Sequence, residues 1–158
     1  FRRVLFRSER VVDAFRGDLH VERMGQVELA EQDLRGLLES DPDNVHALNG
    51  LGYMLLTNTT RLEEASKLIR RAHELQPDDA AITDSLGWVE FKLGRPQEAL
   101  KWLQQAYDKY PDPEVAAHLG EVLWTLGEKE RARGIWDKSL IDDPEHKVLR
   151  ETIQRLTQ

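Results

Sequence analysis

The chain lacks cysteine altogether, which excludes disulfides, thiolate nucleophiles and cysteine-bound zinc. No uninterrupted apolar run approaches the roughly 18 residues that a membrane-spanning helix requires. Glycine (10) and proline (6) are sparse in 158 residues, which favours helices over a sheet-rich fold. Positive charge is also in deficit, since 22 Lys and Arg face 29 Asp and Glu for a net charge of -7. A chain with this charge repels a phosphate backbone, so nucleic acid is not an expected partner.

The composition is nevertheless that of a folded protein. Hydrophobic residues make up 40% of the chain and charged residues 32%, enough for one core and for well-solvated outer faces. The opening residues 1–8, FRRVLFRS, are short, basic and unlike the remainder. They have neither the apolar run nor the cleavage site of a signal peptide. We therefore predict that residues 1–8 are a non-native or disordered tail.

Three kinds of residue recur with a constant spacing. Four prolines in similar surroundings are 35, 34 and 33 residues apart, and four alanines, each twelve residues before its proline, repeat the same steps. Three glycines form a third series. The members are Pro42, Pro77, Pro111 and Pro144; Ala30, Ala65, Ala99 and Ala132; and Gly52, Gly87 and Gly120.

A period of about 34 residues, with a Leu-Gly pair, a later alanine and a closing proline, resembles the tetratricopeptide repeat. The pairs Leu51-Gly52, Leu86-Gly87 and Leu119-Gly120 carry this resemblance. It implies an all-α fold, a right-handed α-solenoid of helix-turn-helix repeats with a C-terminal capping helix. The implied repeats are an atypical one at about 9–42, then 43–77, 78–111 and 112–144, followed by a solvating helix at 145–158.

The recurring residues have physical roles in such a repeat. Glycine inside a helix costs about 1 kcal/mol relative to alanine, so its recurrence predicts close approach of the paired helix, with the alanines as the matching small residues. We expect Gly94 and Gly127 to end first helices in the left-handed conformation. The aspartates after the prolines, Asp43, Asp78 and Asp112, are the predicted N-caps of the following helices.

Two departures from the pattern are visible. The second repeat has one extra residue between its helices, in Thr57–Thr60, where the sequon at Asn58 is interpreted as an ordinary loop. The first repeat has Gly17 and Asp18 where leucine and glycine belong. A degenerate first repeat and a capped end together predict the C-terminal piece of a longer repeat protein.

Residues that could support catalysis are present, but their placement does not predict a site. No two histidines are four residues apart, so no zinc site is expected. The paired aspartates all lie at proline-marked turns, where helix caps belong. Gly50-Leu51-Gly52 lacks the third glycine of a dinucleotide loop. We therefore expect no enzyme, no cofactor and no metal.

The resemblance implies that the first helix of each repeat lines a concave groove, through residues at its second, fifth, ninth and twelfth places. Tyr53, Trp88, Phe91 and Trp124 are the expected aromatic anchors. The alternative is that these rings pack on neighbouring helices, which applies most to Phe91 and Trp124; Trp102 and Trp136 are expected to pack. The predicted partner-binding residues are His46, Asn49, Tyr53, Leu56, Asp84, Trp88, Phe91, Glu114, Ala117, Glu121 and Trp124.

The charges in this set indicate the kind of partner. Family members that bind a C-terminal carboxylate use lysines and asparagines at the fifth and ninth places, and only Asn49 fits. Asp84, Glu114 and Glu121 instead predict a hydrophobic, mildly acidic groove. Such a groove favours an apolar or basic, extended or helical protein segment.

A narrower resemblance rests on residues 82–89, ITDSLGWV, with Lys92-Leu93-Gly94 and Val148–Thr152. These stretches are similar to repeats of proteobacterial outer-membrane tetratricopeptide lipoproteins. That similarity implies the periplasmic face of the outer membrane, and an adaptor for a C-terminal processing protease and its cell-wall hydrolase substrates. Without it, the cytoplasm is expected. The alternatives are self-association into a homo-oligomer through the first repeat, or a non-catalytic region of a larger enzyme.

Overall fold

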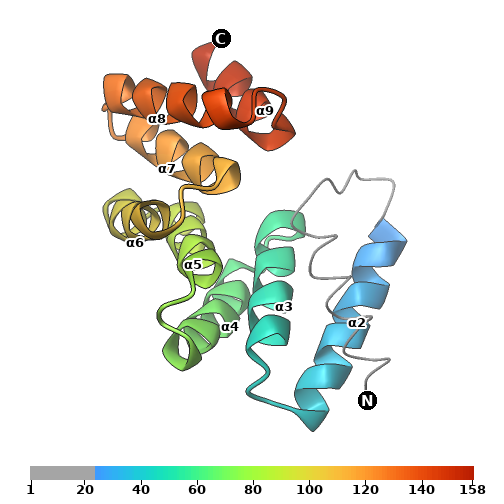
Figure 1. The fold of residues 1–158 in the computed structure, drawn as a ribbon. Coiled ribbons are helices and arrows are strands. Elements are labelled where there is room, and N and C mark those ends of the chain that lie inside the picture. The colour runs from blue at the N-terminus through green and yellow to red at the C-terminus, as the bar shows by residue number, and fades with distance from the viewer. Residues whose placement is uncertain (1–23) are drawn as a thin grey trace. The chain divides into compact units, whose positions relative to one another are not determined.

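A computed structural model of the chain describes residues 24–158. Throughout these residues the regular structure is α-helical, which confirms the predicted all-α fold (Figure 1). The helix from Met24 to Ser40 is α2. The following helices are α3 Val45–Asn58, α4 Leu62–Leu75, α5 Ala80–Lys92, α6 Pro96–Lys109, α7 Pro113–Thr125, α8 Lys129–Asp142 and α9 Lys147–Thr157. None of these helices is both long and apolar enough to cross a bilayer. The predictions for residues 1–8, Gly17 and Asp18 lie outside the described residues.

The described residues divide into two compact units, and the division falls within α5, after Ser85. In the first unit α3 packs against both α2 and α4. Its core includes Leu48, Ala72 and Ile82. In the second unit α7 packs against α6, α8 and α9. The core there is larger and centres on residues such as Leu103, Leu119 and Trp136.

Within each helix pair the glycine of the first helix lies directly against the second helix. A Cβ added to Gly52 would lie 2.6 Å from Ile69 Cγ1, and one added to Gly87 would lie 2.6 Å from Leu103 Cγ. A Cβ on Gly120 would overlap the indole ring of Trp136. The predicted close approach is therefore confirmed.

The side chain nearest each glycine is not that of the predicted alanine, although the Ala65 carbonyl oxygen lies 3.1 Å from a Cβ added at Gly52. Ala65, Ala99 and Ala132 are fully buried, but the side chains closest to the glycines belong to residues four positions further along the second helix. The reason is that helical side chains lean toward the N-terminus of their helix, so a residue covers the turn before its own Cα. The alanines leave the space that these larger side chains fill.

The turns inside the hairpins use two different chemistries. Gly94 and Gly127 have φ values of 80° and 86°, so the predicted left-handed helix ends are confirmed. Behind them, the N–H of Arg95 donates to the Glu90 carbonyl at 2.9 Å, which closes the last turn of α5. The α3–α4 turn has no glycine; instead the Thr59 hydroxyl donates to the Leu55 carbonyl at 2.6 Å. This turn is as short as the other two, because the extra residue of the repeat lies in α3, which has 14 residues against 13 in α5.

The N-caps agree with the prediction in one case of three. Asp112 caps α7 as predicted, and its carboxylate accepts an N–H bond of 2.9 Å. The caps of α3 and α5 are Asn44 and Asp79, one residue after the predicted Asp43 and Asp78. The shift arises because a four-residue proline turn precedes α3 and α5, closed by bonds of 3.1 and 3.3 Å, whereas α7 starts at a second proline and needs one residue less.

The helix α9 follows the same kind of turn and occupies the place of a first helix. Its N-cap is His146, whose Nδ1 accepts from the Leu149 N–H at 3.3 Å, and Leu149 and Thr152 are buried. Eight residues after each earlier N-cap stands the close-approach glycine, but eight residues after His146 stands Gln154. A second helix cannot approach α9 there as closely as α8 approaches α7.

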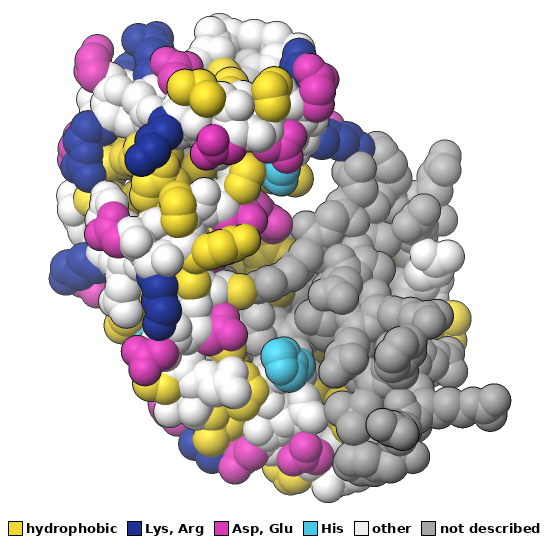
Figure 2. Space-filling view, viewed as in Figure 1, with side chains coloured by type: hydrophobic (Ala, Val, Ile, Leu, Met, Phe, Trp, Pro, Cys, Tyr) yellow, Lys and Arg dark blue, Asp and Glu magenta, His cyan; other side chains and the backbone are white. Residues whose placement is uncertain are grey.

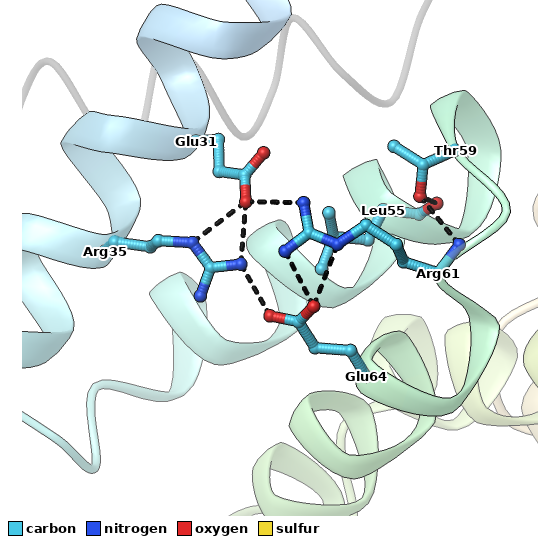
Figure 3. A network of polar contacts seen from close by, with 6 residues as sticks. All are labelled: Glu31, Arg35, Leu55, Thr59, Arg61 and Glu64. Carbon is cyan, nitrogen blue, oxygen red and sulfur yellow. Dashed lines mark hydrogen bonds and ion pairs between the residues drawn. The ribbon is translucent and has the colours of Figure 1, made fainter.

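Four charged side chains tie α2 to the start of α4 in the first unit (Figure 3). Arg35 contacts Glu31 at 2.6 Å and Glu64 at 2.5 Å, while Arg61 contacts Glu31 at 2.9 Å and Glu64 at 2.7 Å. Burial alone would raise the pKa of Glu31, but the hydrogen bonds from Arg35 and Arg61 outweigh burial and lower it. The Arg35 hydrogen bond is also the main reason that the pKa of Glu64 is lowered. Both carboxylates are therefore held in the charged form.

This network makes the stability of the first unit depend on pH. Because both pKa values are lowered by folding, the contribution of the carboxylates is complete above their ordinary value of 4.5 and is lost as pH falls through the folded values. We expect Glu31→Gln with Glu64→Gln to lower the free energy of unfolding by about 1 kcal/mol at pH 7, since the groups are partly exposed. The difference from wild type should vanish near pH 3. Urea unfolding followed by circular dichroism measures both values.

The matched control changes two exposed carboxylates of the same region, Glu39→Gln with Glu63→Gln, and alters the net charge equally. We expect this control to match wild type at both pH values. An equal loss of stability in the two double variants would contradict the structural role of the network.

Candidate functional site

The eleven predicted partner-binding residues lie on α3, α5 and α7, but most of them are buried. His46 is exposed, and Phe91, Glu114 and Trp124 are half-buried. The other seven are 0–7% exposed, so the expectation that they are exposed is wrong: Asn49, Tyr53, Leu56, Asp84, Trp88, Ala117 and Glu121. Their role in partner binding stays a prediction.

The burial follows from the number of neighbours that a first helix has. The second helices bury a single stripe, as α4 does with Ala65, Ser66, Ile69 and Ala72. By contrast, α7 buries every residue from 115 to 123, because α6, α8 and α9 all pack against it. A partner segment would therefore reach the first helices through the few side chains that stay open.

Trp88 connects α5 to α7 in the second unit. Its ring stacks on the His118 imidazole with centroids 4.2 Å apart, and on Phe91 at 5.2 Å. The ammonium of Lys92 lies 4.7 Å from the centre of the Trp88 ring. Trp88 thus packs on a neighbouring helix, the alternative considered from the sequence. The role of His118 was missed, although it directly follows the predicted position Ala117.

Glu121 is paired with a residue of the last helix. Its carboxylate accepts from Arg155 Nη2 at 2.6 Å, and the side chain of Glu121 is 9% exposed against 57% for Arg155. The hydrogen bond that Arg155 donates to Glu121 raises the pKa of Arg155, against the effect of burial. The group exposed to solvent at this position is therefore mainly the Arg155 guanidinium. It compensates the negative charge of Glu121.

The position of Arg155 could have been predicted by counting residues from the N-cap of α9. It lies nine residues after the N-cap His146, and Tyr53, Trp88 and Glu121 lie nine residues after their own N-caps. Residues 145–158 were predicted only as a solvating helix, so Arg155 was not among the predicted partner-binding residues. The ninth place of successive first helices is thus occupied in turn by two aromatic residues, an acid and a base.

Trp124 faces the second helix of its own hairpin. Its ring stacks on Trp136 with centroids 5.6 Å apart, while Lys129 Nζ and the guanidinium of Arg133 lie 4.9 and 5.2 Å from its centre. All three neighbours belong to α8. Trp136 is 1% exposed, which confirms its predicted packing role, and Trp102 on α6 is half-buried.

These repeats match two known family models, both described as tetratricopeptide repeat, over residues 43–112 and 85–146. The chain belongs to the tetratricopeptide-repeat family. Proteins of this family bind protein or peptide partners and are generally non-catalytic scaffolds.

Two curated relatives come from Pseudomonas aeruginosa. TPR repeat-containing protein PA4667 is 50% identical over 136 residues, which is 86% of this chain and 23% of that protein. Type IV pilus assembly protein PilF is 28% identical over 112 residues, which is 69% of this chain and 44% of PilF. The chain thus spans less than half the length of either relative.

Solved structures share the fold. The thermophilic TPR protein TTC0263 of Thermus thermophilus superimposes with a TM-score of 0.72 at 22% identity, covering 85% of this chain and 75% of its own. YrrB, described as a TPR protein with an unusual peptide-binding site, has a TM-score of 0.61 at 23% identity and covers 85% of this chain and 72% of its own. At these identities the likeness shows the fold alone, and that fold is the predicted solenoid of tetratricopeptide repeats.

The Glu121–Arg155 pair predicts an unequal response to the loss of two arginines of α9. Arg155→Gln leaves a nearly buried carboxylate without its cation, so we expect the free energy of unfolding at pH 7 to fall by about 1–2 kcal/mol. Arg150→Gln removes an arginine that pairs at 2.8 Å with Glu145, which is 84% exposed, and should cost less than about 0.5 kcal/mol. Urea unfolding compares the two, and an equal cost would show that Glu121 does not depend on Arg155.

Proposed function

We propose that this chain is a protein-interaction module that holds a segment of a partner protein against its first helices. The observation that carries the proposal is that Phe91, Glu114 and Trp124 stay half-open on first helices of the second unit. A repeat architecture places equivalent residues at regular intervals along a surface, which suits an extended or helical segment. The peptide-binding site named for YrrB supports the same use of the fold.

The partner segment is proposed to be predominantly apolar. Phe91 and Trp124 are half-buried aromatic residues, which provide contact area at low entropic cost. The preference for basic segments that the sequence predicted loses part of its basis, because Glu121 is neutralised by Arg155. Of the other acids in the predicted set, Asp84 is buried and Glu114 is half-buried.

A narrower form of the proposal is that the module acts at the periplasmic face of the outer membrane as an adaptor for a C-terminal processing protease. Its support is the similarity of residues 82–94 and 148–152 to repeats of such lipoproteins. PA4667, which is 50% identical to this chain over the matched residues, is a bacterial protein whose name mentions the repeats and no partner.

Site-specific photo-crosslinking tests the proposal without disturbing the core. A photoreactive amino acid is placed singly at the open first-helix positions His46, Phe91 and Glu114 in the protein expressed in its native cell. The matched controls are exposed second-helix positions, Lys67, Gln105 and Asp137. Substitution of Trp88 by alanine is a poorer test, because removing a buried tryptophan costs about 3–5 kcal/mol by itself.

We expect the first-helix positions to form a crosslink to one and the same protein, and the second-helix positions to form none with it. If that protein is the protease or its hydrolase substrate, the adaptor form is supported as well. Crosslinks to a common partner from the second-helix positions alone, or equally from both sets, would contradict the proposal.

A further inference from the structure

The corner where α7 leads into α8 carries an aromatic ring with two cations beside it. Trp124 is half-buried, and the buried Trp136 stacks on it at 5.6 Å. Lys129 Nζ lies 4.9 Å and the Arg133 guanidinium 5.2 Å from the ring centre. The two basic residues are four positions apart on α8, so they share one face of that helix. Two positive charges, those of Lys129 and Arg133, therefore lie close together beside the Trp124 ring.

These two cations differ from most basic side chains around them. Arg131 pairs with Glu128 at 2.7 Å, and Lys101 pairs with Glu98 at 2.8 Å. Lys129 and Arg133 are exposed and form no ion pair with any residue in the described part of the chain. Two adjacent cations without a carboxylate partner create a local positive potential that attracts an anion, although the net charge of the protein is -7.

Figure 2 shows that hydrophobic and basic side chains lie together on the surface. Hydrophobic side chains lie between Lys or Arg side chains over the part formed by α7 and α8. Arginine fits a carboxylate through two parallel N–H bonds, and lysine adds a point charge. The half-open indole between them can contact the aliphatic stem of the acidic residue.

We propose that Trp124, Lys129 and Arg133 form a binding site for an acidic segment of a protein partner, with Asp or Glu carboxylates bound by the two cations. The site lies where Trp124 meets α8, and it shares the Trp124 ring with the apolar contact of the first helices. A phosphate group is the alternative anion, and competition with a phosphate distinguishes it from carboxylates. The proposal therefore adds a second, electrostatic contact to the apolar one.

The four tryptophans of the chain allow a site-specific test by nuclear magnetic resonance. Each indole N–H of the isotope-labelled protein gives one signal, and the signal missing from Trp124→Phe identifies Trp124. Acetylated and amidated hexaglutamate is the probe. We expect it to shift the Trp124 signal saturably and more than the other three, and we expect hexaglutamine to leave that signal in place.

Charge variants decide whether the cations on the ring are responsible. Lys129→Gln with Arg133→Gln should raise the Kd for hexaglutamate by about tenfold, equivalent to about 1.4 kcal/mol. Lys101→Gln with Lys138→Gln removes the same charge from exposed positions of the second unit and should change the Kd little. The indole spectrum of each variant also shows whether its fold is intact.

Three outcomes would overturn the proposal. The first is the absence of a Trp124 shift in the wild-type protein, and the second is an equal loss of affinity in the two double variants. The third is saturation of the signal by inorganic phosphate or a short oligonucleotide at lower concentration than by hexaglutamate. The first-helix proposal fails by a separate result, the absence of a common crosslinked protein at His46, Phe91 and Glu114.

Discussion

Everything in this structure depends on the contact between a glycine in the first helix of a hairpin and a large side chain in the second. At Gly87 even a methyl group would lie 2.6 Å from Leu103, and at Gly120 it would overlap Trp136. A glycine inside a helix costs about 1 kcal/mol, and the burial of a whole leucine or tryptophan side chain outweighs that cost. At the equivalent place α9 has Gln154, which would keep a second helix from approaching as closely.

The close packing of the first helices also decides where function can lie. Because α7 has neighbours on three sides, its ninth residue, Glu121, is buried and needs the cation of Arg155. Trp88 is likewise covered by His118. Residues at positions that the family uses for partners here also hold the helices together. The side chains that stay open are half-buried ones such as Phe91 and the cations beside Trp124.

The repeat spacing predicted the fold, the left-handed turn at Gly94 and the cap at Asp112, since each depends on backbone geometry repeated along the chain. Interactions across helices could not be read in this way. The cap of α3 moved to Asn44 because a proline turn adds one residue, a shift that spacing to the nearest aspartate does not show. The place of Arg155 follows from its distance to the N-cap, but its pairing with Glu121, 34 positions away, does not. The repeat period predicts where a residue lies on its own helix, but not which residues of other helices its side chain contacts.

A double-mutant cycle between Gly120 and Trp136 tests the central contact most directly. Gly120→Ala should lower the free energy of unfolding by about 1–3 kcal/mol in the wild-type background, because the new methyl group displaces the indole. In the Trp136→Leu background the same substitution should cost at least about 1 kcal/mol less, since the shorter side chain leaves room for it. An equal cost in both backgrounds, measured by urea unfolding, would contradict the account.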